Sequence, residues 1–180
     1  MFKRFSPNVK HKGSAIILAT LFWLNAQSGG YKDAEVWCIA MDLRTPNREA
    51  LVEHPMFPRL KIFDGSSTDT KIVSSIAEKA AKCDRVMVIL DSNHTHEHVL
   101  GELNLYASLV SVGSYCVVFD TVIEDFDGVE FVDRPWGKLN NPKTAVAEFL
   151  TTNSDFAVDY SIDEKLLISA APGGYLKRVK

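Results

Sequence analysis

Two apolar stretches that each end in an aspartate constrain the fold of this chain more than any other feature. Residues 85–90 form a mainly apolar run that ends at Asp91, and residues 114–119 form a second run that ends at Asp120. Residues 97–110 lie between them and have the pattern of a helix. Strand, helix and strand with an acidic residue after each strand are typical of an open α/β sheet, where ligands bind beyond the carboxyl ends of the strands. The segment therefore predicts a small-molecule site.

The same alternation of strand and helix patterns continues along the chain. Further predicted strands cover residues 35–41 and 60–63, and further predicted helices cover residues 46–53, 69–82 and 142–150. Such alternation predicts a mostly parallel sheet covered on both faces, that is, a Rossmann-like, doubly wound α/β fold. Residues 156–161 and 166–170 predict two closing strands that form a C-terminal antiparallel hairpin.

The bulk properties are those of one globular domain spanning residues 1–180. The formal net charge of −3 gives no reason to expect nucleic acid as a partner, and no apolar segment is long enough to predict a membrane span. Cys38, Cys83 and Cys116 are odd in number and lack the spacing of a zinc knuckle or a disulfide framework. A reducing cytoplasm is the simplest location for such a chain.

The N-terminal apolar segment, residues 15–24, allows two interpretations. Basic residues before it and polar residues after it imitate a secretory signal. The alternative is a buried first helix with Ser14 as its N-cap, which ends at Gly29 and Gly30. The absence of paired cysteines downstream favours the buried helix.

Residues 121–141 predict a long acidic loop. This segment carries five carboxylates together with the turn-forming residues Gly128, Gly137 and Pro135. Long loops inside compact domains often act as lids or binding loops, so we expect this one to cover a site.

Two positions that follow the predicted strands of the first half are candidates for cofactor binding. Asp42 ends the strand of residues 35–41, where an acidic residue accepts hydrogen bonds from a ribose in nucleotide-binding α/β folds; the alternative is a cap on the next turn. Gly65, Ser66 and Ser67 are small enough for backbone amides to approach a ligand, although an ordinary strand-to-helix turn explains them equally well.

Asp91 and Asp120 are candidate metal ligands because they end neighbouring strands. Paired carboxylates suit Mg²⁺, which keeps several waters and needs only one or two protein carboxylates. The alternative is that both carboxylates cap helices or anchor loops.

Three histidines follow Asp91. His94 lies closest to the strand end, and we expect it to face the crevice as a general base or as the holder of a water at the metal. His94 and His98 would share one face of a helix, as in half of a zinc site, but no third ligand is evident. His96 and His98 are predicted to be surface residues of the first helical turn.

The block of residues 89–103, with Gly113-Ser114-Tyr115 and Asp120-Thr121, resembles the cephalosporin hydroxylase family. That family is similar to class I S-adenosylmethionine-dependent methyltransferases, including sugar O-methyltransferases, and its metal site resembles that of catechol O-methyltransferase. Further matches are Asp42, Asn47-Arg48, His54-Pro55, the segment 65–69 and the tail 172–176. The resemblance covers nearly all residues after Gly13.

The resemblance implies a residue-by-residue assignment. Asp42 would bind the ribose of S-adenosylmethionine, and Ser66 or Ser67 beside Gly65 would lie near the adenine. Gly13 and Ser14 match the end of a His-Gly-Gly-Ser-like loop at the cofactor, and Asp91 would contribute to the same pocket. Asp91 and Asp120 would hold Mg²⁺ or another divalent cation, with Asp91 and His94 as the catalytic residues.

The implied reaction is methyl transfer to a hydroxyl of a sugar or a secondary metabolite. A homo-oligomer is compatible with this assignment, but the sequence does not determine the oligomeric state. Two alternatives remain: a degenerate member that serves as a binding or partner subunit, and a metal-dependent hydroxylase with iron and a 2-His-1-carboxylate triad. The chain departs from the family pattern in its N-terminal segment, residues 1–12, where Ser6, Asn8 and Lys12 replace an acidic residue and two glycines, and at Phe119, where the family has a glutamate.

Overall fold

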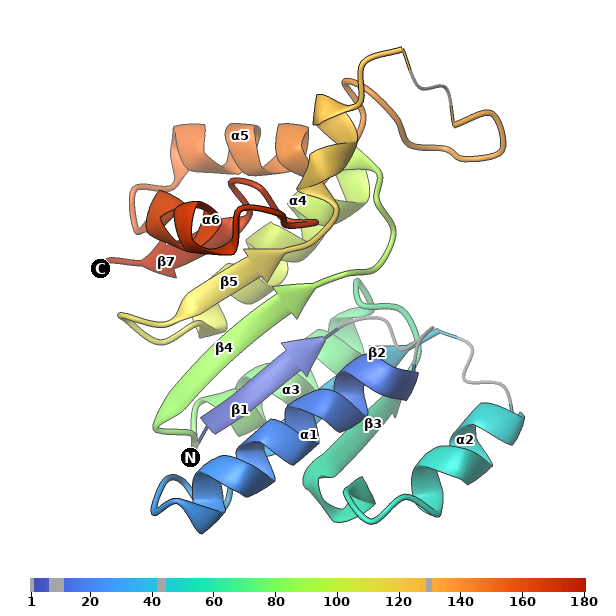
Figure 1. Ribbon diagram of the computed structural model, residues 1–180, viewed down its shortest axis with the longest axis vertical. Coiled ribbons are helices and arrows are strands. Elements are labelled where there is room, and N and C mark those ends of the chain that lie inside the picture. Colours follow the sequence, from blue (N-terminus) through green and yellow to red (C-terminus); the bar gives the residue numbers. More distant parts are fainter. Residues whose placement is uncertain (1, 7–11, 42–44, 129–130) are drawn as a thin grey trace. The chain divides into compact units, whose positions relative to one another are not determined.

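The computed structural model describes residues 2–6, 12–41, 45–128 and 131–180 of the chain. It divides into two compact units, Met1–Met87 and Val88–Lys180, and the boundary falls within strand β4 (Arg85–Leu90). Figure 1 shows the elements of both units, which are described separately below. Among the described residues, no helix is both long enough and apolar enough to cross a membrane.

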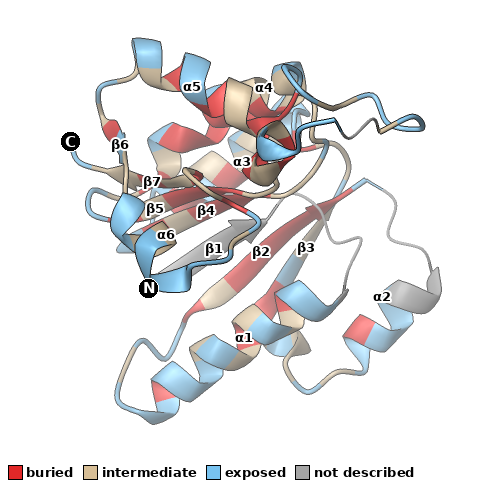
Figure 2. Ribbon diagram, turned by 45° about the horizontal axis from the view of Figure 1, so that its top comes forward, coloured by how far each residue is buried: buried red, intermediate tan, exposed pale blue. Residues whose placement is uncertain are grey.

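The first unit is a three-stranded parallel sheet with helices on both faces. Its strands are β1 (Phe2–Ser6), β2 (Glu35–Ala40) and β3 (Leu60–Asp64), in the order β3-β2-β1, and all neighbours pair in parallel. Its helices are α1 (Lys12–Gln27), α2 (Thr45–Val52) and α3 (Thr70–Ala80), with a 3-10 turn at Phe57–Arg59. Helices α1 and α3 lie on opposite faces of these strands (Figures 1 and 2).

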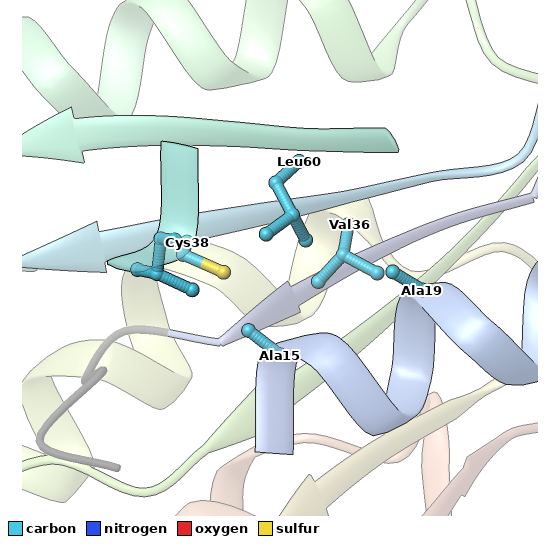
Figure 3. Packing of buried hydrophobic residues seen from close by; sticks show 6 residues of the cluster. Ala15, Ala19, Val36, Cys38 and Leu60 are labelled. Atoms are coloured by element: carbon cyan, nitrogen blue, oxygen red, sulfur yellow. The ribbon is translucent and has the colours of Figure 1, made fainter. Parts of the chain in front are cut away.

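Small residues bring α1 close to the sheet of the first unit. Ala15 and Ala19 of α1 face Val36 and Cys38 of β2, with Leu60 of β3 beside them (Figure 3). Burial raises the pKa of the Cys38 thiol to about 12, so this thiol stays protonated and behaves as a small apolar side chain. The predicted first helix is present, but only one face of it is buried, since Ile17, Leu21 and Leu24 are exposed. Because α1 begins at Lys12, however, Ser14 lies inside its first turn, and its prediction as an N-cap was wrong.

The second unit carries strands in the order β4-β5-β7-β6. These are β5 (Tyr115–Val118), parallel to β4, then β7 (Tyr175–Arg178) and β6 (Phe156–Val158), with both pairs involving β7 antiparallel. Its helices are α4 (His96–Tyr106), α5 (Pro142–Thr152) and α6 (Tyr160–Leu166), with 3-10 turns at Ala107–Leu109 and Thr121–Asp125. Figures 1 and 2 show α4 and α5 packed together on one face, with α6 on the other.

The predicted α/β fold with a mostly parallel sheet and a C-terminal antiparallel pair is confirmed, but the second strand of that pair was misplaced. Residues 160–166 form helix α6, whose N-cap Asp159 accepts a hydrogen bond from the Ser161 amide, and the returning strand is β7. The chain turns back at Gly173, whose φ of 72° suits glycine. The apolar residues 166–168 that suggested a strand are exposed.

Gly174 is required by a close approach of two backbones. A Cβ at this position would lie 2.1 Å from the carbonyl oxygen of Val118, at the end of β5. We expect Gly174→Ala to lower the free energy of unfolding by about 2 kcal/mol or more, because a backbone carbonyl cannot move aside as a flexible side chain can. Chemical denaturation measures the loss. Gly101→Ala is the matched control, since its Cβ meets nothing within 4 Å and α4 gains a better helix former. Equal stability of both variants would contradict the expected steric conflict.

Candidate functional site

The carboxyl ends of β4 and β5 lie side by side in the second unit. The two strands pair in parallel with Leu90 opposite Val118, and the amide of Phe119 donates to the carbonyl of Leu90 at 2.9 Å. Asp91 follows β4 directly, and Asp120 follows β5 after Phe119. The alignment of the strand ends therefore brings the two carboxylates to one edge of the sheet.

His94 joins the two carboxylates. Its Nε2 lies 3.1 Å from an oxygen of Asp120 and 3.8 Å from an oxygen of Asp91. One ligand atom from each of the three residues lies within 4.8 Å of the others, so the set has the dimensions of a cation site. The predicted proximity of these three side chains is thus present in the structure.

The environment of Asp120 is unfavourable for an isolated carboxylate. Burial raises its pKa; the neighbouring His94 opposes that shift, and the negative charge of Asp91 adds to it. Asp120 also has a left-handed backbone, with φ 58° and ψ 22°, a conformation that is uncommon outside glycine but tolerated by Asp and Asn. Strained backbone and converging like charges are characteristic of binding and catalytic sites.

The donor set fits a divalent cation. Two partly exposed carboxylates converge on one point, and a cation there would relieve their repulsion. Carboxylate oxygens suit Mg²⁺, which completes its shell with water. Nδ1 of His94 is buried without a hydrogen-bond partner among the described residues, which leaves Nε2 as the nitrogen that faces the carboxylates.

An aromatic residue of the acidic loop lies against the site. The ring of Trp136 is 5.2 Å from that of His94, centroid to centroid, with 39° between the planes. Phe131 packs on Trp136 at 4.7 Å, and the guanidinium of Arg134 lies 5.9 Å from the Trp136 ring centre. The loop thus supplies an apolar wall next to the histidine.

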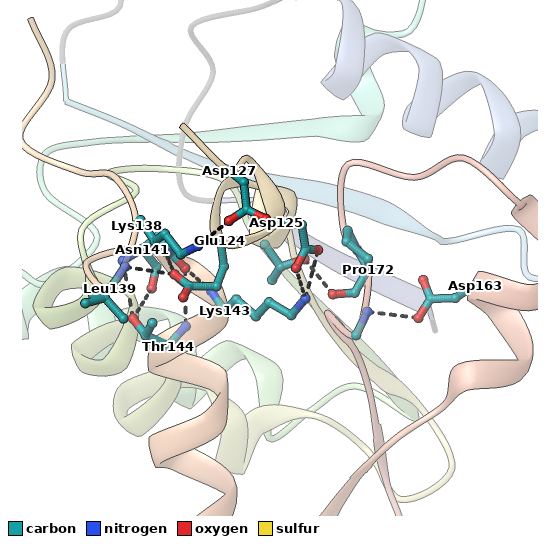
Figure 4. Close-up of polar contacts among 12 residues, drawn as sticks. Glu124, Asp125, Asp127, Lys138, Leu139, Asn141, Lys143, Thr144, Asp163 and Pro172 are labelled. Carbon is teal, nitrogen blue, oxygen red and sulfur yellow. Dashed lines mark hydrogen bonds and ion pairs between the residues drawn. The ribbon is translucent and has the colours of Figure 1, made fainter. Parts of the chain in front are cut away.

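Hydrogen bonds and ion pairs fix the loop to the body of the second unit (Figure 4). Glu124 accepts hydrogen bonds from the amide of Leu139 and from the side chain of Asn141, which is fully buried and caps α5. Lys143 of α5 pairs with Asp125. Residues 121–125 form a 3-10 turn rather than irregular loop. These contacts hold both ends of the segment that carries Trp136.

The side chains of His96 and His98 are less exposed than predicted. The ring of His96 bridges to α5, 2.8 Å from the Thr144 hydroxyl and 3.1 Å from Glu148. Nε2 of His98 lies 3.4 Å from Glu102, one helical turn away. Both residues lie in the first turn of α4 as predicted, but their side chains are partly buried against acidic partners rather than fully exposed. His94 precedes α4, so it does not share a helix face with His98 and the zinc arrangement is not formed.

His98 gives the second unit a specific dependence of stability on pH. Its hydrogen bond to Glu102 raises the pKa of His98 above the ordinary value of 6.5, despite the opposing effect of burial. A raised pKa in the folded state stabilises the protein fully below the unfolded-state pKa, and the contribution is lost as pH rises through the folded-state pKa. We expect the difference in free energy of unfolding between wild type and His98→Gln to shrink as pH increases above about 6.5. Denaturant titrations at several pH values measure this difference. A difference between wild type and His98→Gln that stays constant with pH would contradict the linkage.

Comparison with known proteins places these features in a family. The family described as Rhamnosyl O-methyltransferase/CmcI matches residues 7–179. The chain belongs to the Rhamnosyl O-methyltransferase/CmcI family. Rhamnosyl O-methyltransferases of Mycobacterium tuberculosis and Mycobacterium bovis are 31% identical to it over 126 residues, covering 67% of this chain and 48% of theirs. The chain thus spans about half the length of the curated relatives it matches.

Solved structures support the fold. Glucose-6-phosphate 1-dehydrogenase from Mycobacterium avium covers 86% of this chain and 34% of its own at 14% identity, with a TM-score of 0.52. A protein from Corynebacterium glutamicum covers 99% of this chain and 72% of its own at 8% identity, also with a TM-score of 0.52. At these identities the likeness concerns the fold alone, and it agrees with the Rossmann-like α/β architecture.

The cofactor residues implied by the Rhamnosyl O-methyltransferase/CmcI resemblance belong, apart from Asp91, to the first unit. Gly13 and Ser14 are exposed in the first turn of α1. Asp42 lies outside the described residues. Gly65, with φ 145°, begins the turn after β3; the Ser66 hydroxyl is 2.9 Å from that of Thr68, and Ser67 is buried.

Three residues near the site were not predicted from the sequence to be functional. Trp136 lies within the predicted acidic loop of residues 121–141 but was not singled out, although a tryptophan in an acidic loop is a signal for a binding surface. Glu102 occupies a core position of α4. A carboxylate within an apolar helical stripe can be recognised in a sequence and indicates a specific buried role. Ser92 gave no signal, because its importance depends on its contact with Glu102.

Proposed function

We propose that the chain carries the catalytic site of an S-adenosylmethionine-dependent O-methyltransferase that acts on a sugar hydroxyl with the assistance of a divalent cation. The observation that carries the proposal is the convergence of Asp91, His94 and Asp120 at the ends of β4 and β5. Membership of the family and the sugar-modifying mycobacterial relatives support the same reaction class.

Each residue of the site has a role in this reaction. Asp91 and Asp120 would hold the cation, and His94 would accept the proton of the acceptor hydroxyl at Nε2, the nitrogen that faces the carboxylates. When bound, S-adenosylmethionine supplies an electrophilic methyl group and the cation lowers the pKa of the hydroxyl. In such a transfer the acceptor oxygen would take the methyl group that the cofactor's sulfur gives up, and His94 would hold the hydroxyl proton. Alignment of the reacting atoms is the main contribution of the protein.

The first turn of α1 supports a role in binding the charged end of the cofactor. Its exposed amides have no partners within the helix, and Gly13 leaves open space around the backbone. Such amides attract carboxylates. Gly13 and Ser14 therefore remain proposed cofactor residues, as do Asp42, Ser66 and Ser67.

Trp136 is the proposed acceptor-binding residue. A hexose carries an apolar C–H face beside its hydroxyls, and an aromatic ring can cover that face while polar groups orient the reacting oxygen. The ring lies next to His94, so an acceptor stacked on it would present a hydroxyl to the proposed base. The contacts that fix both ends of residues 121–141 support their role as the acceptor loop.

Replacement of Trp136 by alanine is expected to raise the KM for the acceptor by about 3- to 10-fold, with a smaller change in kcat. Steady-state kinetics with the acceptor varied measures the effect. Trp136→Phe keeps an aromatic face and should recover most of the affinity. Val132→Ala, an exposed position in the same segment, is the control. An unchanged KM in Trp136→Ala would remove this residue from the acceptor site.

The set of side chains at the site supports methyl transfer over hydroxylation. An iron hydroxylase of the common type needs two histidines and one carboxylate. Here one histidine stands with two carboxylates, while His96 and His98 contact other acidic partners.

The decisive assay measures transfer of a labelled methyl group from S-adenosylmethionine to a panel of free and glycosidic deoxyhexoses, with Mg²⁺ or with a chelator. We expect Mg²⁺-dependent labelling of a sugar. Absence of labelling, with no binding of the cofactor, would favour a degenerate member that acts as a partner subunit.

A further inference from the structure

A buried carboxylate stands behind the candidate site, in the middle of α4. The buried face of this helix consists of Val99, Leu103 and Tyr106, at the spacing of one helical stripe, and Glu102 lies in the same stripe. The side chain of Glu102 is 0% exposed. A carboxylate in such surroundings is strongly unfavourable unless hydrogen bonds or opposite charges compensate for its lost hydration.

Two side chains from different parts of the second unit compensate for the lost hydration of the Glu102 carboxylate. The hydroxyl of Ser92 donates to Oε2 at 2.7 Å, and Nε2 of His98 lies 3.4 Å from Oε1. His98 belongs to the same helix, one turn earlier. Ser92 belongs to the segment that leaves β4, directly after Asp91. The carboxylate thus connects the rigid helix to the segment that carries Asp91 and His94.

Stability alone does not account for this arrangement. A buried ion pair contributes little net stability, and an apolar residue of similar size usually serves a core equally well or better. Leu103 and Val99, next to Glu102, already supply the apolar packing of this face. A carboxylate placed here has one further effect, which is to fix Ser92.

We propose that Glu102 is a positioning residue, which holds residues 91–94 in place by accepting the hydrogen bond of Ser92. This inference rests on the proposed function for the role of Asp91 and His94. Partners behind a metal-ligating carboxylate commonly change metal affinity by about 10- to 100-fold when removed. A displacement of about 1 Å at a reacting group can lower a rate by about 100-fold.

The test uses three variants of the full chain and two readouts. Glu102→Met removes the acceptor with an apolar side chain of similar length; Ser92→Ala removes the donor; Glu102→Gln keeps a carbonyl oxygen that accepts from Ser92. The first readout is the backbone ¹⁵N order parameter of Ser92, Asn93 and His94 without metal. The second is the affinity for Mn²⁺ alone, measured by electron paramagnetic resonance.

We expect order parameters of about 0.85 in the wild type and similar values in Glu102→Gln. In Glu102→Met and Ser92→Ala they should fall toward about 0.6. Mn²⁺ affinity should fall about 10-fold or more in the last two variants and stay near the wild-type value in Glu102→Gln. Thermal unfolding verifies that each variant is folded at the temperature of the measurement. Glu97→Gln, at an exposed position of the same helix, is the control.

The outcomes separate the inference from the proposed function. Wild-type order parameters in Glu102→Met or in Ser92→Ala would overturn the inference, and so would a Glu102→Gln variant as mobile as Glu102→Met. If Glu102→Met fails to fold, Ser92→Ala decides alone, because it leaves Glu102 paired with His98. A wild type that binds no Mn²⁺ would count against the proposed metal site, whereas the order parameters would still decide whether Glu102 fixes this segment.

Discussion

Asp120→Asn is expected to weaken Mg²⁺ binding by about 100-fold or more and to reduce methyl transfer accordingly. The substitution removes one of the two negative charges that converge at the strand ends and keeps the shape of the side chain. Asparagine also tolerates the left-handed backbone at this position, with φ 58°, so the loss should not include a large folding defect. Titration calorimetry with Mg²⁺ measures the affinity, and thermal unfolding verifies the fold.

A matched control is Asp155→Asn, which removes the same charge from a partly exposed side chain after α5. We expect its Mg²⁺ affinity and activity to match the wild type. Equal Mg²⁺ affinity of wild type and Asp120→Asn would show that Asp120 is not a metal ligand.

His94→Gln is expected to lower the rate of methyl transfer by about 100- to 10,000-fold, the usual contribution of a general base. Glutamine can still donate a hydrogen bond to Asp120 but cannot accept the proton of the acceptor hydroxyl at neutral pH. Mg²⁺ affinity should change far less than in Asp120→Asn, because both carboxylates remain. The two variants therefore separate cation binding from proton transfer.

The control for this variant is His96→Gln, because His96 lies two positions further along and contacts α5 instead of the carboxylates. Single-turnover measurements with saturating Mg²⁺ and cofactor isolate the chemical step. A rate in His94→Gln close to that of the wild type would assign the base role to another group.

The parts of the site that follow from the local sequence pattern and the parallel strand order were predicted correctly. The apolar runs before Asp91 and Asp120 are short and uninterrupted, so they indicated parallel strands whose carboxyl ends meet at one edge, and the structure has this arrangement. The helix after residue 95 was also readable from its apolar stripe. These features depend on neighbours along the chain, which a sequence displays directly.

The parts that were missed depend on contacts distant in sequence. The returning strand β7 was placed too early because residues 166–168 are apolar, whereas the capping contact of Asp159 and the tight fit of Gly174 against Val118 determine where helix α6 and β7 lie. Trp136 lies against His94 because contacts distant in sequence hold both ends of residues 121–141, and the hydrogen bond from Ser92 to Glu102 joins residues ten positions apart. Such pairings have no periodic signature.

Calorimetric titration of S-adenosylmethionine into the purified chain, with and without Mg²⁺, tests the central proposal most directly. We expect micromolar binding of the cofactor, which would show that the departures at Ser6, Asn8 and Lys12 leave the cofactor pocket competent. Absence of binding in both conditions would contradict the proposed methyltransferase activity and leave a protein with the family's fold but without its reaction.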